Sequence, residues 1–426
     1  MSNEITSSGK AVIQGFFRRR MLALWGVLML MGPGIITSNV DNDAGGITTY
    51  SLAGAEFGLS MLWSLIPITV VLFIVQEMGA RMGVVSGKGL SDLIRERFGV
   101  KLTFYLMILL VLTNLGNTLA EFAGIAASLE IFGLSRYMTV PLSILFLMWL
   151  AVKGTYKSVE KVFLTACLFY VSYVVTGFLV RPDWLEVVSS VAAPTLRTDS
   201  AFLVMLVGLV GTTIAPWMQF YLQASVVDKG LASKDLGAVR LDVIIGSIVV
   251  SVVAFFIILA CAATLFKAGI KVETAEQAAL ALRPLAGSYC TWLFAFGLFT
   301  ASMFAAAILP LSTAYTVCEA FGWESSLDKK FSEAPQFYGL YCFTIFFSGL
   351  VILTPTLPLV PIMFISQVIN GLVLPVVLIF MVLLVNDRSV MREHTNGFFL
   401  NLVSWAIVIV LVGLSIVMVF SGLWKT

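Results

Sequence analysis

Long apolar runs recur along almost the whole chain, and they restrict what it can fold into more than any other feature. An α-helix needs about 20 residues to cross a bilayer, and nearly every run is at least close to that length. Eleven runs can be marked, at 22–57, 59–83, 102–132, 137–152, 159–180, 200–226, 240–266, 285–317, 336–354, 358–384 and 398–423. The pattern predicts an all-α membrane protein with eleven transmembrane helices.

The composition agrees with this prediction. Of the 426 residues, 59% are hydrophobic and only 12% are charged, about half the charged share of a soluble domain. We expect no cleavable signal, because residues 1–20 are polar and lead into a run too long for one. Residues 1–20 are therefore predicted to be a cytoplasmic segment. The net charge of +2 gives no indication of nucleic-acid binding.

The basic residues predict an orientation. If the N-terminus is cytoplasmic, 19 of the 26 Lys and Arg residues fall in cytoplasmic segments, as the positive-inside rule requires. With eleven spans, the C-terminus then lies outside. We expect the plasma (inner) membrane of a prokaryote.

Two carboxylates interrupt the first apolar run. Asp41 and Asp43 lie between Gly34 and Gly46, at about the depth of the bilayer centre. A charge at that depth costs several kcal/mol unless it is paired or faces a wet cavity, and non-helical backbone is tolerated there only under similar conditions. The stretch predicts an ion or substrate site on a broken transmembrane helix.

The sixth run is broken as well, by Gly211 and Pro216. Each broken run opens a block of five spans, and because five is odd the second block must be inverted. Paired broken helices in two inverted halves are typical of secondary transporters. We predict a first repeat over 21–181, a second over 198–384, and an additional helix within 396–426.

Several segments resemble the NRAMP family of divalent-metal transporters. They are Gly32-Pro33-Gly34 followed by Asp43, the loop Gly83–Leu90, Leu119-Ala120-Glu121, the sixth-run break Gly211–Trp217, Ser366–Asn370, and Asn386–Arg388. The resemblance covers nearly the whole chain. It implies a LeuT-like fold, with a 5+5 inverted repeat whose first and sixth helices are broken, and it implies alternating access.

The departures from the family pattern are informative. Asp43 keeps the metal-binding aspartate, but Ala44 replaces a Pro and Gly46 replaces a coordinating Asn. In the sixth run Ala215 replaces a Met and Trp217 a His. Soft sulfur ligands favour transition metals, whereas magnesium prefers hard oxygens and keeps several waters. The pattern therefore resembles the NRAMP-related magnesium transporters, with a wide site for a partly hydrated Mg²⁺ ion.

Proton coupling is not expected. In proton-coupled relatives an Asp precedes the third-helix Glu by three residues and the His lies on the proton route. Here Thr118 precedes Glu121, and Trp217 stands at the histidine position; neither side chain can titrate. The resemblance thus implies facilitated magnesium uptake, with manganese as the second candidate ion.

The candidate residues form two sets, with no catalytic residue and no cofactor. The predicted metal site consists of Asp43, Gly46, Thr212, Ala215 and Gln367. The predicted transport pathway consists of Asp41, Trp217, Glu121, Thr118 and Asn370. Three have structural alternatives, because Asp43 can cap a helix, while Glu121 and Asn370 can make ordinary interhelical hydrogen bonds. Glu77 and Arg81, spaced i and i+4, are predicted to form an ion pair.

Three other functions stay open at this stage. The first is a proton-coupled manganese or iron transporter whose site was rebuilt with Gln367 and Asp41. The second is a sodium-coupled transporter of an organic solute, which two neighbouring carboxylates disfavour. The third is a membrane enzyme, although no HExxH, GxSxG or P-loop pattern occurs and the one histidine, His394, lies in a polar loop. The expected partners are a divalent ion and the lipid bilayer, and we expect a monomer.

Overall fold

A computed structural model describes residues 37, 40–153, 167–326 and 329–423. Within those residues every regular element is helical, and eight helices are long and apolar enough to cross a membrane. The predicted count of eleven spans is therefore not confirmed. The segment 1–20, the first part of the first predicted span and the start of the fifth lie outside the described residues.

The long helices follow the predicted runs closely. They are α3 (Ala44–Phe57), α4 (Leu65–Ser86), α6 (Val100–Glu130), α7 (Arg136–Lys153), α9 (Val171–Leu179), α11 (Ser200–Thr213), α12 (Pro216–Asp228), α13 (Leu236–Cys261), α16 (Cys290–Phe321), α17 (Pro335–Ile352), α18 (Leu359–Val385) and α20 (Phe398–Leu423). The short elements are η1 (Gly58–Ser64), α5 (Leu90–Phe98), η2 (Cys167–Tyr170), α10 (Trp184–Ala192), η3 (Ser233–Asp235), η4 (Ala262–Phe266), α14 (Ala275–Ala279), η5 (Leu280–Leu282), α15 (Arg283–Ala286), η6 (Gly287–Tyr289) and α19 (Arg388–Met391).

One short helix lies between the second and third predicted runs, outside any predicted span. Helix α5 occupies most of the segment between α4 and α6 and buries Leu90, Leu93 and Ile94. Gly87 ends α4 in the left-handed conformation, with φ +65°, which lets the chain turn into α5. The segment contains many charged residues, and its apolar face has only three residues. This face is too short to produce a recognisable helical periodicity in the sequence.

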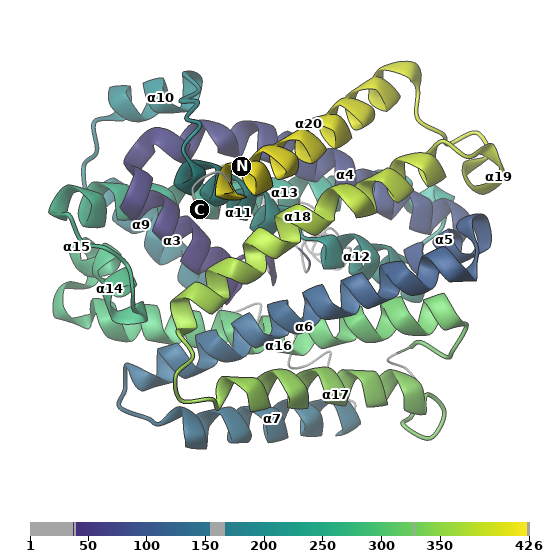
Figure 1. Cartoon of the computed structure of the whole chain (residues 1–426), viewed down its shortest axis with the longest axis horizontal. Coiled ribbons are helices and arrows are strands. Elements are labelled where there is room, and N and C mark those ends of the chain that lie inside the picture. Colours follow the sequence, from purple (N-terminus) through teal and green to yellow (C-terminus); the bar gives the residue numbers. More distant parts are fainter. Residues whose placement is uncertain (1–36, 38–39, 154–166, 327–328, 424–426) are drawn as a thin grey trace, which may run out of the picture.

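Helices from the two predicted blocks pack against each other in matching pairs. Helix α4 contacts α13, α6 contacts α16, and α7 contacts α17. Figure 1 shows α6 beside α16 and α7 beside α17 along one edge of the molecule. These are the second, third and fourth spans of the two blocks. Because a two-fold axis between inverted repeats would pair equivalent helices in this way, we propose that 21–181 and 198–384 are such repeats.

The last helix lies on the outside of the bundle. Helix α20 packs on α18 and α11, yet it leaves large apolar side chains exposed, including Phe398 at 88% and Ile409 at 67%. Such a surface is stable only in contact with lipid or another protein. This position fits an addition to the two blocks.

A buried polar cluster joins α20 to the rest of the fold. The predicted pair is confirmed, with Arg81 Nε 3.1 Å from Glu77 Oε1, and Arg240 of α13 also reaches Glu77 Oε1 at 2.9 Å. Arg81 then donates to the carbonyl of His394 and to Oδ1 of Asn396, both at 2.5 Å. One arginine therefore connects α4 to the segment that leads into α20.

Replacing Arg81 with Met should destabilise the protein by about 3 kcal/mol, because it breaks a buried ion pair and strands two acceptors. Replacing Arg97 with Met is the matched control. That side chain is 60% exposed in its ion pair, so its loss should cost less than about 1 kcal/mol. Thermal unfolding of the purified variants measures both effects. Equal shifts of the unfolding midpoint would show that the buried cluster has no special role.

Candidate cation site

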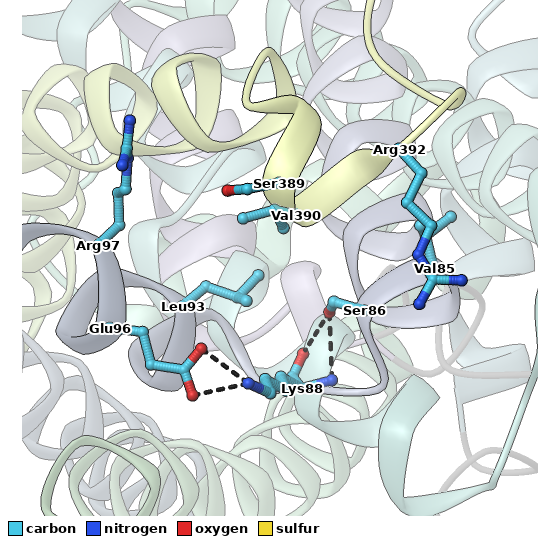
Figure 2. A pocket seen from close by; sticks show the side chains of 9 residues that line it. All are labelled: Val85, Ser86, Lys88, Leu93, Glu96, Arg97, Ser389, Val390 and Arg392. Carbon is cyan, nitrogen blue, oxygen red and sulfur yellow. Dashed lines mark hydrogen bonds and ion pairs between the residues drawn. The ribbon is translucent and has the colours of Figure 1, made fainter.

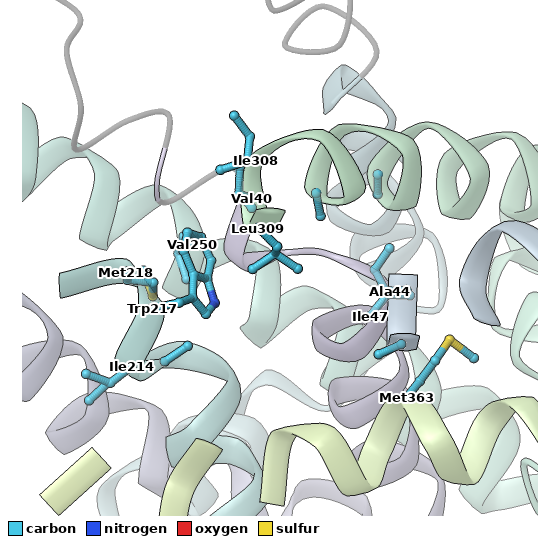
Figure 3. Close-up of a cluster of buried hydrophobic side chains, with 14 of the residues drawn as sticks. Val40, Ala44, Ile47, Ile214, Trp217, Met218, Val250, Ile308, Leu309 and Met363 are labelled. Atoms are coloured by element: carbon cyan, nitrogen blue, oxygen red, sulfur yellow. The ribbon is translucent and has the colours of Figure 1, made fainter. Parts of the chain in front are cut away.

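The two broken helices meet at the centre of the molecule. Helix α3 starts at Ala44, and Asp43 is its N-cap, with Oδ1 accepting from the Gly46 N–H at 2.7 Å. In the second break α11 ends at Thr213 and α12 begins at Pro216, with Ala215 in an extended conformation. Buried apolar side chains, among them Val40, Ile214 and Trp217, lie around the two breaks (Figure 3).

The second break frees a backbone acceptor. In a continuous helix the carbonyl of Thr212 would accept from the N–H of residue 216, but that residue is Pro216 and has no N–H. The Thr212 side chain is buried as well, and its Oγ1 has no hydrogen-bond partner in the described part of the chain. Within the described residues, Thr212 therefore has two oxygens without a partner at the break, its carbonyl and its Oγ1, and either could serve as a ligand.

Gly46 lies at the point where the two breaks touch. A Cβ at this position would be 2.5 Å from the carbonyl oxygen of Asp41 and 3.3 Å from Oγ1 of Thr212. Those two oxygens therefore converge beside the N-terminus that Asp43 caps. A side chain at residue 46 would meet the Asp41 backbone in this conformation, so the small size of Gly46 does not by itself open space at this point.

Three carboxylates are buried at the N-terminus of α3. Asp41, Asp43 and Glu121 are 2%, 5% and 0% exposed. Glu121 Oε2 accepts from the Ala44 N–H at 3.2 Å, so Glu121 and Asp43 both bind backbone donors of the same helix end. Glu121 Oε1 and both carboxylate oxygens of Asp41 have no hydrogen-bond partner among the described residues.

The charge of this cluster is not balanced by a basic side chain. Each ion pair seen in the described residues involves other groups, and none includes these three carboxylates. A helix N-terminus compensates part of one negative charge, but several buried carboxylates need protons or a cation. This site can therefore bind a cation, and its acceptors are all oxygens.

Gln367 is also at the site, on α18. A Cβ at Gly45 would lie 1.8 Å from its Nε2, so the glutamine side chain packs directly on the start of α3. Its Oε1 accepts from Asn370 Nδ2 at 2.9 Å, and Asn370 exchanges hydrogen bonds with Asn117 of α6 at 2.9 and 3.0 Å. The position of Gln367 supports its predicted part in the site, whereas Asn370 fits its structural alternative.

Of the remaining predicted residues, two border the site and one makes only a structural hydrogen bond. Trp217 is 2% exposed and packs at the start of α12 with its ring centroid 6.3 Å from that of Tyr221, and Ala215, at the break itself, is 1% exposed. Both border the site. Thr118 donates to the carbonyl of Asn114 at 2.8 Å within its own helix, which is an ordinary intrahelical bond.

Three residues of the site were not predicted. Asn42, between the two aspartates, is 1% exposed with Oδ1 unpartnered within the described residues, and its carbonyl accepts from the Tyr170 hydroxyl. Tyr50 of α3 and Thr213 of α11 form a hydrogen bond of 2.9 Å between their hydroxyl groups. The polar triplet at 41–43 was the signal for Asn42. Tyr50 gave none, because its partner comes from a distant helix.

No group of three or more His, Cys, Asp or Glu side chains has metal-binding geometry in the described residues. A cation at this site would therefore need backbone, hydroxyl or amide oxygens in addition to carboxylates. The Asp41 carbonyl and the Thr212 hydroxyl are neighbouring oxygens of this kind, whereas the Gln367 amide turns its Nε2 to the start of α3 and its Oε1 to Asn370. Mg²⁺ and Mn²⁺ both accept such oxygen ligands.

Solved structures of membrane transporters share this fold. A manganese transporter from Eremococcus coleocola, in complex with an aromatic bis-isothiourea compound, matches with a TM-score of 0.73 at 20% identity, covering 92% of this chain and 86% of that one. MHP1, a nucleobase-cation-symport-1 family transporter, matches with a TM-score of 0.56 at 14% identity, covering 92% and 91%. The chain is an all-α membrane protein with the LeuT-like fold.

The family can be stated as well. The model of the natural resistance-associated macrophage protein-like (Nramp) family matches residues 34–421, and the chain belongs to that family. A divalent metal cation transporter MntH from Bacillus subtilis is 24% identical over 438 residues, covering 98% of this chain and 99% of its own. An MntH from Erwinia tasmaniensis is 30% identical over 284 residues, covering 64% and 68%. These matches confirm the predicted family, but they give no support for its magnesium-transporting branch.

Proposed function

We propose that this protein carries a divalent metal cation across the cell membrane by alternating access, with Asp43 as its main charged ligand. The observation that carries the proposal is the group of buried carboxylates without a basic partner, at the point where two broken helices meet. The relatives named as divalent metal cation transporters support the same substrate class. The protein is a transporter and not an enzyme.

The residues of the site favour Mg²⁺ as the ion. Position 215 carries no thioether and position 217 no imidazole, so the candidate ligands that remain are oxygens of Asp43, Asp41 and Thr212. Uptake without a proton is energetically sufficient, since two charges crossing an inside-negative potential of about 100 mV release roughly 4.6 kcal/mol. This is our proposal from the residue types alone.

Proton-coupled transport of Mn²⁺ or Fe²⁺ is the second candidate, and the comparisons favour it. The structural match is to a protein named as a manganese transporter, and the relatives in sequence bear the name MntH. The site also supplies more titratable groups than Thr118 and Trp217 suggested, because Asp41 and Glu121 are buried beside Asp43. A carboxyl group can carry a proton as well as bind a metal.

A flux assay separates the two candidates. The full chain is reconstituted in vesicles under an inside-negative potential, and entry of Mg²⁺, Mn²⁺ and Ca²⁺ is followed together with a pH dye inside. Magnesium entry without acidification supports the first candidate. Saturable manganese entry with acidification, and without magnesium entry, supports the second. Entry of none of the three ions, from a protein that is shown to be folded, would contradict the function itself.

Glu121→Gln is the informative variant in this assay. It keeps the size of the side chain and an oxygen that can accept from the Ala44 N–H, but it cannot exchange a proton in the transport cycle. If the protein is uncoupled, the variant should keep a substantial magnesium flux. If Glu121 carries the coupled proton, metal entry should continue or slow while acidification is lost.

We also propose the location and orientation. The bacterial relatives support a multi-pass protein of the cell membrane, and the distribution of Lys and Arg supports a cytoplasmic N-terminus and an external C-terminus. We expect a monomer to be sufficient, since both broken helices come from one chain. Labelling of single cysteines from each side of the membrane tests the orientation.

A further inference from the structure

A pocket of about 440 Å³ lies at the end of the bundle where α4 and α18 terminate, away from the cation site. It is formed by the end of α4, by α5, and by the segment around α19 (Figure 2). Its lining residues are Val85, Ser86, Lys88, Leu93, Glu96, Arg97, Ser389, Val390 and Arg392. The mechanism proposed above does not use this pocket.

The lining carries three cations and one carboxylate. Lys88 Nζ binds both oxygens of Glu96 at 2.7 Å, and Arg97 Nε is 2.7 Å from Asp387 just outside the pocket. The hydroxyl and the N–H of Ser389 hold the pKa of Asp387 below its usual range, so that this partner stays charged. Arg392 has no carboxylate within ion-pair distance in the described residues.

An anionic ligand can replace the carboxylate partners in these two ion pairs at little cost in stability. The Lys88 and Glu96 side chains are 46% and 48% exposed, and the Arg97 side chain is 60% exposed. Ion pairs this exposed contribute little to stability. A phosphate group entering the pocket would meet Arg392 without a competing partner, and Lys88, at the lower edge in Figure 2, could turn towards it.

The backbone of Arg392 is a second, independent observation. Its φ of +52° and ψ of −116° lie in a region that only glycine adopts easily. A non-glycine residue there carries backbone strain, which is commonly found at functional positions. The strained residue is thus also the one basic residue of the pocket lining that has no carboxylate partner among the described residues.

The surroundings of the pocket indicate where its ligand comes from. Val85, Leu93 and Val390 give the pocket an apolar part. A few residues from Arg97, at the start of α6, Val100 and Tyr105 are 62% and 59% exposed, which marks a lipid-facing surface. The pocket therefore lies at the level of the membrane interface rather than out in the solvent.

We propose that this pocket binds the phosphate headgroup of an anionic membrane lipid. Basic pockets between helices on the cytoplasmic side are suited to such headgroups, and this is the side on which the charge distribution places α5 and α19. The apolar part of the pocket accommodates the glycerol and the first carbons of the chains. The site is distinct from the cation site, so its test does not depend on transport.

The test measures retention of phosphatidylglycerol by the full chain in detergent, with phosphatidylcholine as the neutral comparison. Arg392→Gly removes the guanidinium and also relieves the backbone, so it should fold at least as well as the parent protein. The pocket variant combines Lys88→Gln, Arg97→Gln and Arg392→Gln. The control variant Lys234→Gln, Lys329→Gln and Lys330→Gln removes the same charge from exposed positions outside the pocket.

We expect the pocket variant to lose phosphatidylglycerol affinity by roughly tenfold or more, Arg392→Gly to lose a smaller part, and the control variant to keep it. Equal retention by the pocket and control variants would overturn the proposal. Inorganic phosphate is added in a parallel measurement. If millimolar phosphate displaces the lipid from the parent protein, the site takes soluble phosphate and the assignment to a lipid is wrong.

Discussion

Replacing Asp43 with Asn should abolish divalent cation uptake and leave the fold intact. In the structure the carboxylate is the N-cap of α3, and we propose that it is also the charged ligand beside the second break. Asparagine caps a helix nearly as well as aspartate, so its side-chain oxygen can still accept from the Gly46 N–H. The variant therefore removes the charge and keeps the cap. We expect flux to fall to the level of empty vesicles.

The measurement needs a readout of binding as well as of flux. Titration calorimetry with Mn²⁺ and Mg²⁺ should show the loss of the site in Asp43→Asn, while the thermal unfolding midpoint stays close to that of the parent protein. Asp235→Asn is the matched control, because that aspartate also accepts a backbone hydrogen bond but is only partly buried. Normal uptake by Asp43→Asn would show that Asp43 is only a helix cap.

Replacing Gly211 with Ala should strongly destabilise the protein, because the added methyl group overpacks the contact between α11 and α18. A Cβ at this position would lie 2.0 Å from the carbonyl oxygen of Gln367 and 2.3 Å from the N–H nitrogen of Gly371. Both neighbours are backbone atoms of α18, so α11 and α18 would have to separate. Overpacking of this kind costs about 3 kcal/mol or more, and it would also move Thr212 away from Gln367.

The control for this prediction is Gly116→Ala. Gly116 lies inside α6, and a Cβ there meets nothing within 4 Å, so alanine should be neutral or stabilise by up to about 1 kcal/mol. The yield of monodisperse protein and the unfolding midpoint measure both variants. A Gly211→Ala protein as stable as the parent would mean that the two helices are not packed backbone to backbone.

Much of the fold follows from local patterns. Most long helices coincide with apolar runs, because a chain in lipid must satisfy its backbone within each span. Both breaks were predicted as well: Gly and Pro interrupt the runs, and the structure starts α3 at Ala44 and α12 at Pro216. The ion pair of Glu77 with Arg81 followed from its spacing, whereas the Arg240 contact with Glu77 needed tertiary structure.

The candidate site was only partly predictable, because several of its contacts join segments that are far apart in the sequence. Gln367 packs on Gly45, two residues after the predicted ligand Asp43, and the carbonyl of Thr212 has no helical N–H partner because residue 216 is proline. The width of the site could not be read from the size of residue 46. The carbonyl of Asp41 lies in the space beside Gly46, and a close approach between segments cannot be recognised in a single sequence. The bond between Tyr50 and Thr213 was missed for the same reason.

The central claim is that a divalent cation binds between the two broken helices on Asp43. The most direct test is anomalous diffraction from crystals of the full chain soaked in Mn²⁺, which reports the position of the metal whichever ion is the natural substrate. We predict a peak at coordination distance, about 2.2 Å, from a carboxylate oxygen of Asp43, next to the break between α11 and α12. A peak elsewhere in the membrane-spanning bundle, with Asp43 bound only to the Gly46 N–H, would contradict the proposed site.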